Sequence, residues 1–181
     1  MNARYTGTAI ALHWLVFALI ACGFTLGMYV ADLPDSPQKS TWVEWHRWLG
    51  VTVFATAVVR LGWRLAHPPP GLPATVPIWQ QRAAAAMHAL LYVLMLAIPL
   101  TGWLHSSASG ATTAYLGLLA LPDLLTRDKV LAAQLKLLHA TLNYALLALV
   151  ALHADAALKH HLVEREDVLR RMLPGLKPPG D

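Results

Sequence analysis

Residues 131–158 read LAAQLKLLHATLNYALLALVALHADAAL and contain two histidines, His139 and His153, fourteen residues apart. On an α-helix, fourteen residues turn through roughly 1400°, about 40° short of four full turns, so both imidazoles project from nearly one face. The same residues rise about 21 Å, a large part of the ~30 Å hydrocarbon thickness of a bilayer. One predicted helix therefore offers a nitrogen ligand near each membrane surface, which is the geometry needed to stack two haems across a bilayer.

The composition is that of a membrane protein. The chain has 181 residues, of which 56% are hydrophobic and 13% charged, whereas a soluble domain carries about 25% charged residues. The single cysteine, Cys22, excludes an internal disulfide, a four-cysteine iron–sulfur site and the C-x-x-C-H attachment of c-type haem. The net charge of +4 is scattered, with no basic stripe that would suggest nucleic acid. We expect one integral membrane domain over residues 1–181 that holds any haem without a covalent link.

Four apolar runs predict an all-α bundle of four transmembrane helices, at about residues 9–30, 42–65, 83–104 and 131–158. Residues 115–121 are apolar but too short to cross, so we expect a re-entrant or surface helix there. The charged tail after Lys159 is expected to lie on the membrane surface. With both termini on one side, that side holds nine Lys or Arg and the other holds five. This difference predicts a multi-pass protein of the bacterial inner membrane with both termini in the cytoplasm.

Alternating helix directions sort the intramembrane histidines into two layers. His46 and His139 fall in the outer layer, while His13, His88 and His153 share the inner one. Polar groups within a span are costly and by default functional, so this layering predicts bis-histidine haem sites, with the inner pair to be chosen from three. Two imidazoles on one iron leave no open position, which suits electron transfer. Zinc is less suitable, because the spans offer few Cys or Glu residues, namely Cys22 and Glu44, to complete a tetrahedral site.

Haem propionates need cationic or hydroxyl partners near each membrane surface. Arg4, Arg60 and Arg64 are candidates for the inner haem, and Arg47, Lys136 and residues 106–109 for the outer one. Each of these cations also fits ordinary flanking of a span. For Asp155, the carboxylate within the fourth span, we expect a contact with Arg or Lys at the interface.

The sequence resembles the bacterial cytochrome b561 family of four-helix, di-haem, quinone-linked membrane cytochromes. The resemblance covers essentially the whole chain in order. Its matching pieces are His13-Trp14, His46-x-x-x-Gly50, Arg60 with Arg64, His88, Pro99-x-x-Gly102-Trp103, Leu138-His139, Leu152-His153-Ala154, His160-His161 and Arg170-Arg171-Met172-Leu173-Pro174.

This resemblance implies that His13 and His153 hold the inner haem b and that His46 and His139 hold the outer one. Asp155 departs from the family, where a small apolar residue is more usual, and it would make the surroundings of the inner haem more polar.

The chain looks most similar to the small standalone members, which implies a superoxide oxidase that passes electrons from periplasmic superoxide to ubiquinone. Superoxide is a small anion and an outer-sphere donor, so it needs a positive approach to a haem edge. Lys136 matches the family at this place and lies three residues before His139, and Arg47 is the second candidate. Ubiquinone also needs protons, and histidine titrates near neutral pH. His160 and His161 are candidates for this role, with His88 and Arg82 as further ones.

Two other functions fit parts of the pattern. The chain could be the haem b subunit of a hydrogenase or dehydrogenase, exchanging electrons between quinone and a docked partner, which co-purification of a large protein would support. It could also be a haem-free transporter or structural membrane protein, with inward histidines as a proton pathway. A visible spectrum without reducible haem bands would support that last reading.

Overall fold

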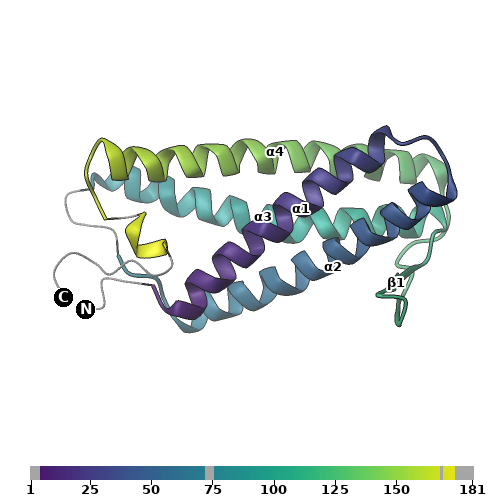
Figure 1. Cartoon of the computed structure of the whole chain (residues 1–181), viewed down its shortest axis with the longest axis horizontal. Coiled ribbons are helices and arrows are strands. Elements are labelled where there is room, and N and C mark those ends of the chain that lie inside the picture. Colours follow the sequence, from purple (N-terminus) through teal and green to yellow (C-terminus); the bar gives the residue numbers. More distant parts are fainter. Residues whose placement is uncertain (1–4, 72–75, 168, 174–181) are drawn as a thin grey trace.

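The computed structural model describes residues 5–71, 76–167 and 169–173 of the chain. Its main elements are four long helices that run side by side with alternating direction (Figure 1). Each is long and apolar enough to cross a membrane, which confirms the predicted all-α four-helix bundle. The elements are α1 (Gly7–Asp32), α2 (Pro37–Ala66), α3 (Ile78–Ser109), β1 (Thr113–Tyr115), β2 (Leu119–Leu121), α4 (Lys129–Leu162) and the 3₁₀ helix η1 (Arg170–Met172).

The helices extend past the predicted apolar spans because polar residues cap them. Ser36 accepts a hydrogen bond from the backbone N–H of Lys39 at the start of α2, where Pro37 takes the first helical position. Asp128 accepts from the N–H groups of Val130 and Leu131 at the start of α4. We call the end with the start of α1 and the end of α4 the inner end, and the opposite end the outer end.

The helices pack as two antiparallel hairpins, α1 with α2 and α3 with α4, which meet along α2 and α3. Few side chains are buried, since much of the apolar surface faces outward, as expected where lipid is the solvent. One small cluster of Val16, Ala57 and Met95 joins three helices near mid-length. The histidines lie where the two hairpins face one another, so their positions depend on how the hairpins pack.

The segment after α3 differs from our prediction. Residues 115–121 do not form a helix but most of an antiparallel β-hairpin, in which Tyr115 pairs with Leu119 and Thr113 with Leu121. Gly110 ends α3 in the left-handed conformation, with φ of 75°, and Gly117 is left-handed in the turn, with φ of 70°. These two glycines allow both reversals, which hydropathy alone does not report.

Candidate functional site

The outer end of the bundle brings His46 of α2 and His139 of α4 together. Their ring centres lie 6.1 Å apart. A metal ion bound at about 2 Å by one nitrogen of each ring would place the ring centres roughly 6 Å apart. Both rings line a cavity with about 440 Å³ of empty space, part of it open, to which all four helices contribute. The cavity lies between facing helices, where helix bundles commonly hold cofactors.

Two glycines make room for these rings. A Cβ on Gly27 of α1 would lie 2.9 Å from Cε1 of His46, and one on Gly102 of α3 would lie 3.1 Å from Cε1 of His139. Any larger residue would have to displace a ring. Gly27 and Gly102 therefore help to set the ring positions, and we call them the cradle glycines.

Hydrogen bonds at Nδ1 orient His139 with its other nitrogen left for a ligand. The carbonyl of Ile98 lies 3.0 Å from Nδ1, and the hydroxyl of Thr101 lies 3.2 Å from it. A metal-bound histidine normally donates its second ring N–H in this way. Nδ1 of His46 is buried without a well-formed hydrogen bond among the described residues, with the backbone of Gly23 beside it.

The inner end holds three histidines. The ring centres of His13 of α1 and His153 of α4 lie 6.4 Å apart, close to the separation of the outer pair. His88 of α3 lies against the other side of this cluster, with its ring centre 5.3 Å from that of His153. The geometry thus leaves His153 with two neighbours, of which His13 matches the separation of the outer pair more closely.

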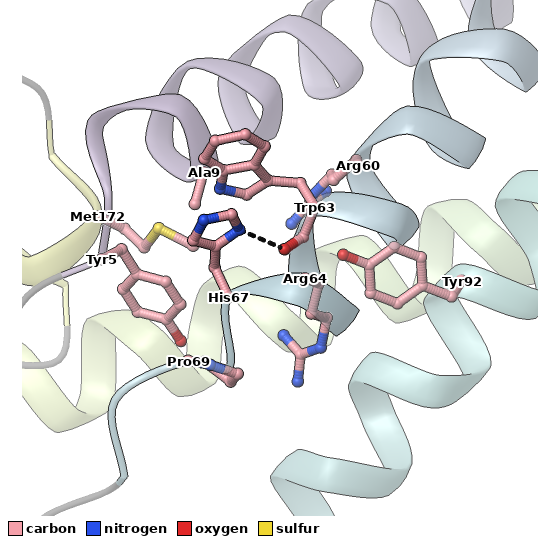
Figure 2. A pocket seen from close by; sticks show the side chains of 9 residues that line it. All are labelled: Tyr5, Ala9, Arg60, Trp63, Arg64, His67, Pro69, Tyr92 and Met172. Carbon is pink, nitrogen blue, oxygen red and sulfur yellow. Dashed lines mark hydrogen bonds between the residues drawn. The ribbon is translucent and has the colours of Figure 1, made fainter.

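Two arginines next to the inner cluster have no carboxylate partner among the described residues. Arg60 donates to Nδ1 of His13 at 2.9 Å, and the guanidinium carbons of Arg60 and Arg64 lie 5.4 and 5.8 Å from the ring centre of Tyr92. Figure 2 shows these three side chains around a pocket that Tyr5 and Met172 also line. Burial raises the pKa of the Tyr5 phenol, so it stays neutral. The pocket is suited to an anionic group.

The contact between Arg60 and His13 has a chemical consequence. An arginine can only donate, so Nδ1 of His13 accepts here. If Nε2 bound a metal, Nδ1 would carry the ring hydrogen. Arg60 would then lose this contact and be free to meet an anion such as a propionate.

Residues 4–175 match the family described as prokaryotic cytochrome b561. The chain belongs to this family. Cytochrome b561 homolog 2 of Escherichia coli strain K12 is 33% identical over 175 residues, covering 94% of this chain and 91% of that protein. Cytochrome b561 homolog 1 of the same strain is 31% identical over 177 residues, covering 96% and 99%. The probable superoxide oxidase CybB of Yersinia pestis is 29% identical over 176 residues, covering 96% and 98%.

Membership of the cytochrome b561 family gives the site its cofactor class. The family implies haem b binding, electron transfer and a multi-pass place in the inner membrane, and its members generally interact with quinones. The chain's own residues fit this group: facing imidazoles, glycine cradles around their rings, and a cavity between the two hairpins.

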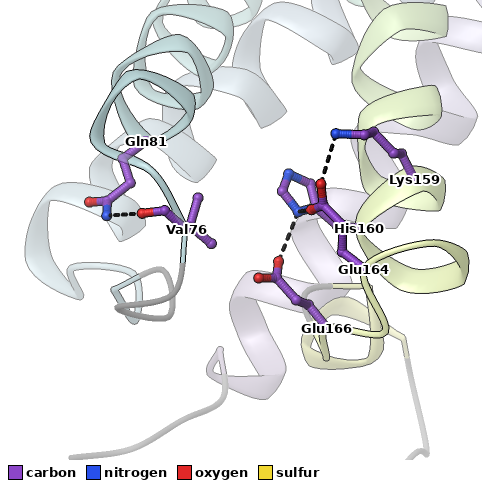
Figure 3. Close-up of polar contacts among 6 residues, drawn as sticks. All are labelled: Val76, Gln81, Lys159, His160, Glu164 and Glu166. Carbon is purple, nitrogen blue, oxygen red and sulfur yellow. Dashed lines mark hydrogen bonds and ion pairs between the residues drawn. The ribbon is translucent and has the colours of Figure 1, made fainter.

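A polar cluster lies past the inner histidines, where α4 ends. Nδ1 of His160 lies 2.8 Å from a carboxylate oxygen of Glu166 and also contacts the carboxylate of Glu164 (Figure 3). The ammonium group of Lys159 forms an ion pair with Glu164 at 2.8 Å. The hydrogen bond from Lys159 lowers the pKa of the Glu164 carboxyl. The chain reverses at Arg165, whose φ of 55° is left-handed, so both carboxylates fold back toward His160. This cluster can accept and pass on protons.

Several predicted residues lie elsewhere. Lys136 is exposed near the outer end and makes no hydrogen bond or ion pair within the described ranges, and Arg47 is half-buried beside Glu44. The serines of residues 106–109 belong to the last turns of α3, where Ser107 bonds to the backbone of Trp103 and Leu124. No contact to a cation is found for Asp155 in the part of the chain that is described, and it is exposed. His161 is half-buried, Arg82 is exposed, and Arg4 lies outside the described residues.

Some contributors could not be found by their residue type. Thr101, Gly27 and the carbonyl of Ile98 act only through their distance to a histidine ring on another helix. The sequence also predicts no role for His105. Its Nδ1 lies 3.0 Å from the carbonyl of Ala132, and this contact joins α3 to α4. A glycine inside a span was a usable signal, because such residues mark close approach between helices.

Proposed function

We propose that this chain is a single membrane domain that binds two haems b and passes electrons from superoxide at the outer surface to ubiquinone at the inner end. The observation that carries this proposal is that two pairs of histidines face each other at two heights of one bundle. The ring centres lie 6.1 Å apart in the outer pair and 6.4 Å apart in the inner pair. His139 and His153 supply one ring to each pair from the same helix.

In this proposal His46 with His139, and His13 with His153, would hold the two haems. Each haem would supply a one-electron carrier, and an iron held by two imidazoles would have no coordination position left for oxygen. Thr101 and the carbonyl of Ile98 hold His139 in the ligating orientation. Arg60 and Arg64 are the proposed partners of the inner propionates, because neither guanidinium faces a carboxylate among the described residues.

At the outer end, Lys136 is the proposed docking cation for superoxide, supported by its exposure and by its place one turn before His139. Arg47, adjacent to His46, is the second cation of this surface. Two superoxide anions release two electrons and leave as two O₂ molecules. Oxidation of superoxide needs no proton, so a cationic approach is the main requirement of this site.

At the inner end, ubiquinone takes up two electrons and two protons to become ubiquinol. The cluster of His160, Glu164 and Glu166 is the proposed proton supply, because it joins the half-buried imidazole to carboxylates at the protein surface. His88 is the proposed group between this supply and the inner pair, since its ring contacts His153. His161 is a further candidate for quinone contact.

The test uses the purified full-length protein in lipid nanodiscs. We expect a reducible haem b spectrum with two haems per chain, and superoxide-driven reduction of a water-soluble ubiquinone analogue with two superoxide ions consumed per quinol. A chain without reducible haem bands would refute the cytochrome assignment for this site. A haem-loaded chain that reduces quinone only when a partner dehydrogenase is added would refute superoxide as donor and favour the subunit hypothesis.

A further inference from the structure

The tip of the β1–β2 hairpin is made of exposed leucines. Residues 114–122 read AYLGLLALP and contain no charged side chain. Leu118 is 90% exposed, Leu119 59% and Leu116 53%. Three neighbouring leucines so exposed on one loop are unusual in water, because contiguous apolar patches normally mark a contact surface.

Hydrogen bonds hold the hairpin beside α2 at the level of the span. The indole of Trp48 donates to the carbonyl of Ala114 at 2.8 Å, and the hydroxyl of Tyr115 lies 3.0 Å from that of Thr52. Thr52 is six residues past His46 toward the inner end, which is about 9 Å deeper along the helix. Strand β1 therefore contacts α2 inward of its outer end. In Figure 1 the hairpin projects sideways from the outer end of the bundle.

Trp103 fixes the other strand at the same boundary, because its indole donates to the carbonyl of Pro122 at 3.1 Å. Tryptophan indoles gather at the headgroup level of a bilayer. Both ends of the hairpin are thus tied to residues that mark this level. Asp123, a charged and exposed residue, follows directly.

The turn keeps a leucine where the backbone disfavours one. Leu116 has φ of 53°, a left-handed conformation that costs least for Gly or Asn. The turn meets much of its own backbone hydrogen bonding, since the N–H of Gly117 reaches the carbonyl of Ala114 and that of Leu118 reaches Tyr115. Such a tip can enter the boundary between headgroups and acyl chains.

We infer that the leucine tip of this hairpin, Leu116 to Leu119, inserts into the outer leaflet of the membrane and anchors the outer end of the bundle to lipid. Hydrogen bonds tie the hairpin to α2, a helix long and apolar enough to cross a membrane. A second copy of the chain is the less suitable occupant, because a stable protein interface buries about 1,200–2,000 Å², far more than three side chains supply. This inference does not depend on the haem ligands or on the electron donor.

The test measures the depth of the tip in nanodiscs. Leu118→Cys in a Cys22→Ser background carries a nitroxide label, and its accessibility to oxygen is compared with that to a water-soluble nickel chelate. Val59→Cys, on the outward face of α2, is the lipid control, and Asp35→Cys, in the α1–α2 loop, is the water control. We expect the ratio at position 118 to lie near that at position 59.

A ratio at position 118 near that at position 35 would overturn the inference, because the tip would then be in water. Protection from both reagents, with dipolar broadening between labels, would also overturn it by showing a contact between copies. Leu119→Cys provides the same measurement if the first variant does not fold. The haem spectrum of each labelled variant shows independently that the bundle is intact.

Discussion

At the scale of single residues, the histidine rings have little freedom. Gly27 and Gly102 leave room for the rings of His46 and His139, while Thr101 and the carbonyl of Ile98 fix the orientation of one of them. Packing and second-layer hydrogen bonds of this kind set both the position and the basicity of a ligand. Small changes around the rings should therefore alter how a cofactor binds.

Replacement of a cradle glycine tests this directly. In Gly27→Ala, the new methyl group would lie 2.9 Å from Cε1 of His46, so the ring must move. We expect weaker binding of the outer haem, seen as a lower haem-to-protein ratio and shifted reduced absorption bands. Gly62→Ala is the matched control, since nothing lies within 4 Å of its added Cβ, and it should retain haem. Equal spectra for both variants would contradict the role of Gly27 in leaving room for the His46 ring.

Removing the histidines of α4 one at a time separates the two layers. His139→Ala should lose the outer haem and His153→Ala the inner one, because the iron would lose one of its two histidine ligands. The haem content of each variant should therefore fall by about half. Pyridine haemochrome assay with redox titration measures the content and identifies which centre remains. His88→Ala serves as comparison and should keep both haems. Retention of both haems in His139→Ala or His153→Ala would contradict the ligand assignment.

At the scale of elements, the ends of the helices decide how the site is held. Asp128 caps α4 with two hydrogen bonds to its first turn, and its own N–H bonds to the carbonyl of Ala108 at the end of α3. The cap therefore connects α3 to α4 at the outer end, about two helix turns before Lys136 and about three before His139.

We expect Asp128→Ala to destabilise the protein by about 1 kcal/mol, the usual cost of losing a helix cap. The measurement is the thermal midpoint in detergent, followed by circular dichroism. Asp123→Ala removes the same charge from the same segment, where Asp123 makes no ion pair or hydrogen bond with the described residues. An equal loss in both variants would mean that charge, and not the cap, matters.

At the scale of the whole molecule, the two ends of the bundle differ in chemistry. The outer end presents an exposed lysine near one histidine pair, and the inner end presents arginines and the cluster around His160 near the other. A one-directional path for electrons, with an anionic donor at one end and proton uptake at the other, agrees with this polarity. The distinction between the ends comes from loops and helix termini, because the mid-span residues are almost all apolar.

Charge at the outer end should control the encounter with superoxide. Lys136→Gln is expected to lower the bimolecular rate roughly two- to five-fold at low ionic strength, with the difference shrinking in salt, because a local positive field steers anions. Stopped-flow haem reduction by superoxide measures it. Lys39→Gln is the control, since Asp35 already neutralises that lysine at 3.0 Å. No effect of Lys136→Gln at low salt would rule out its docking role.

The sequence by itself determined the four spans, because long apolar runs have no stable place outside a membrane, and it determined the layering of histidines, because helical rise converts spacing into depth. The sequence did not predict the hairpin at residues 113–121, since two short strands and their left-handed turn depend on backbone pairing and on Trp48. Only the tertiary structure decided which rings face each other and that His88 joins His13 and His153. Spacing along one helix fixes height and face, whereas the distance between two rings depends on how separate helices pack.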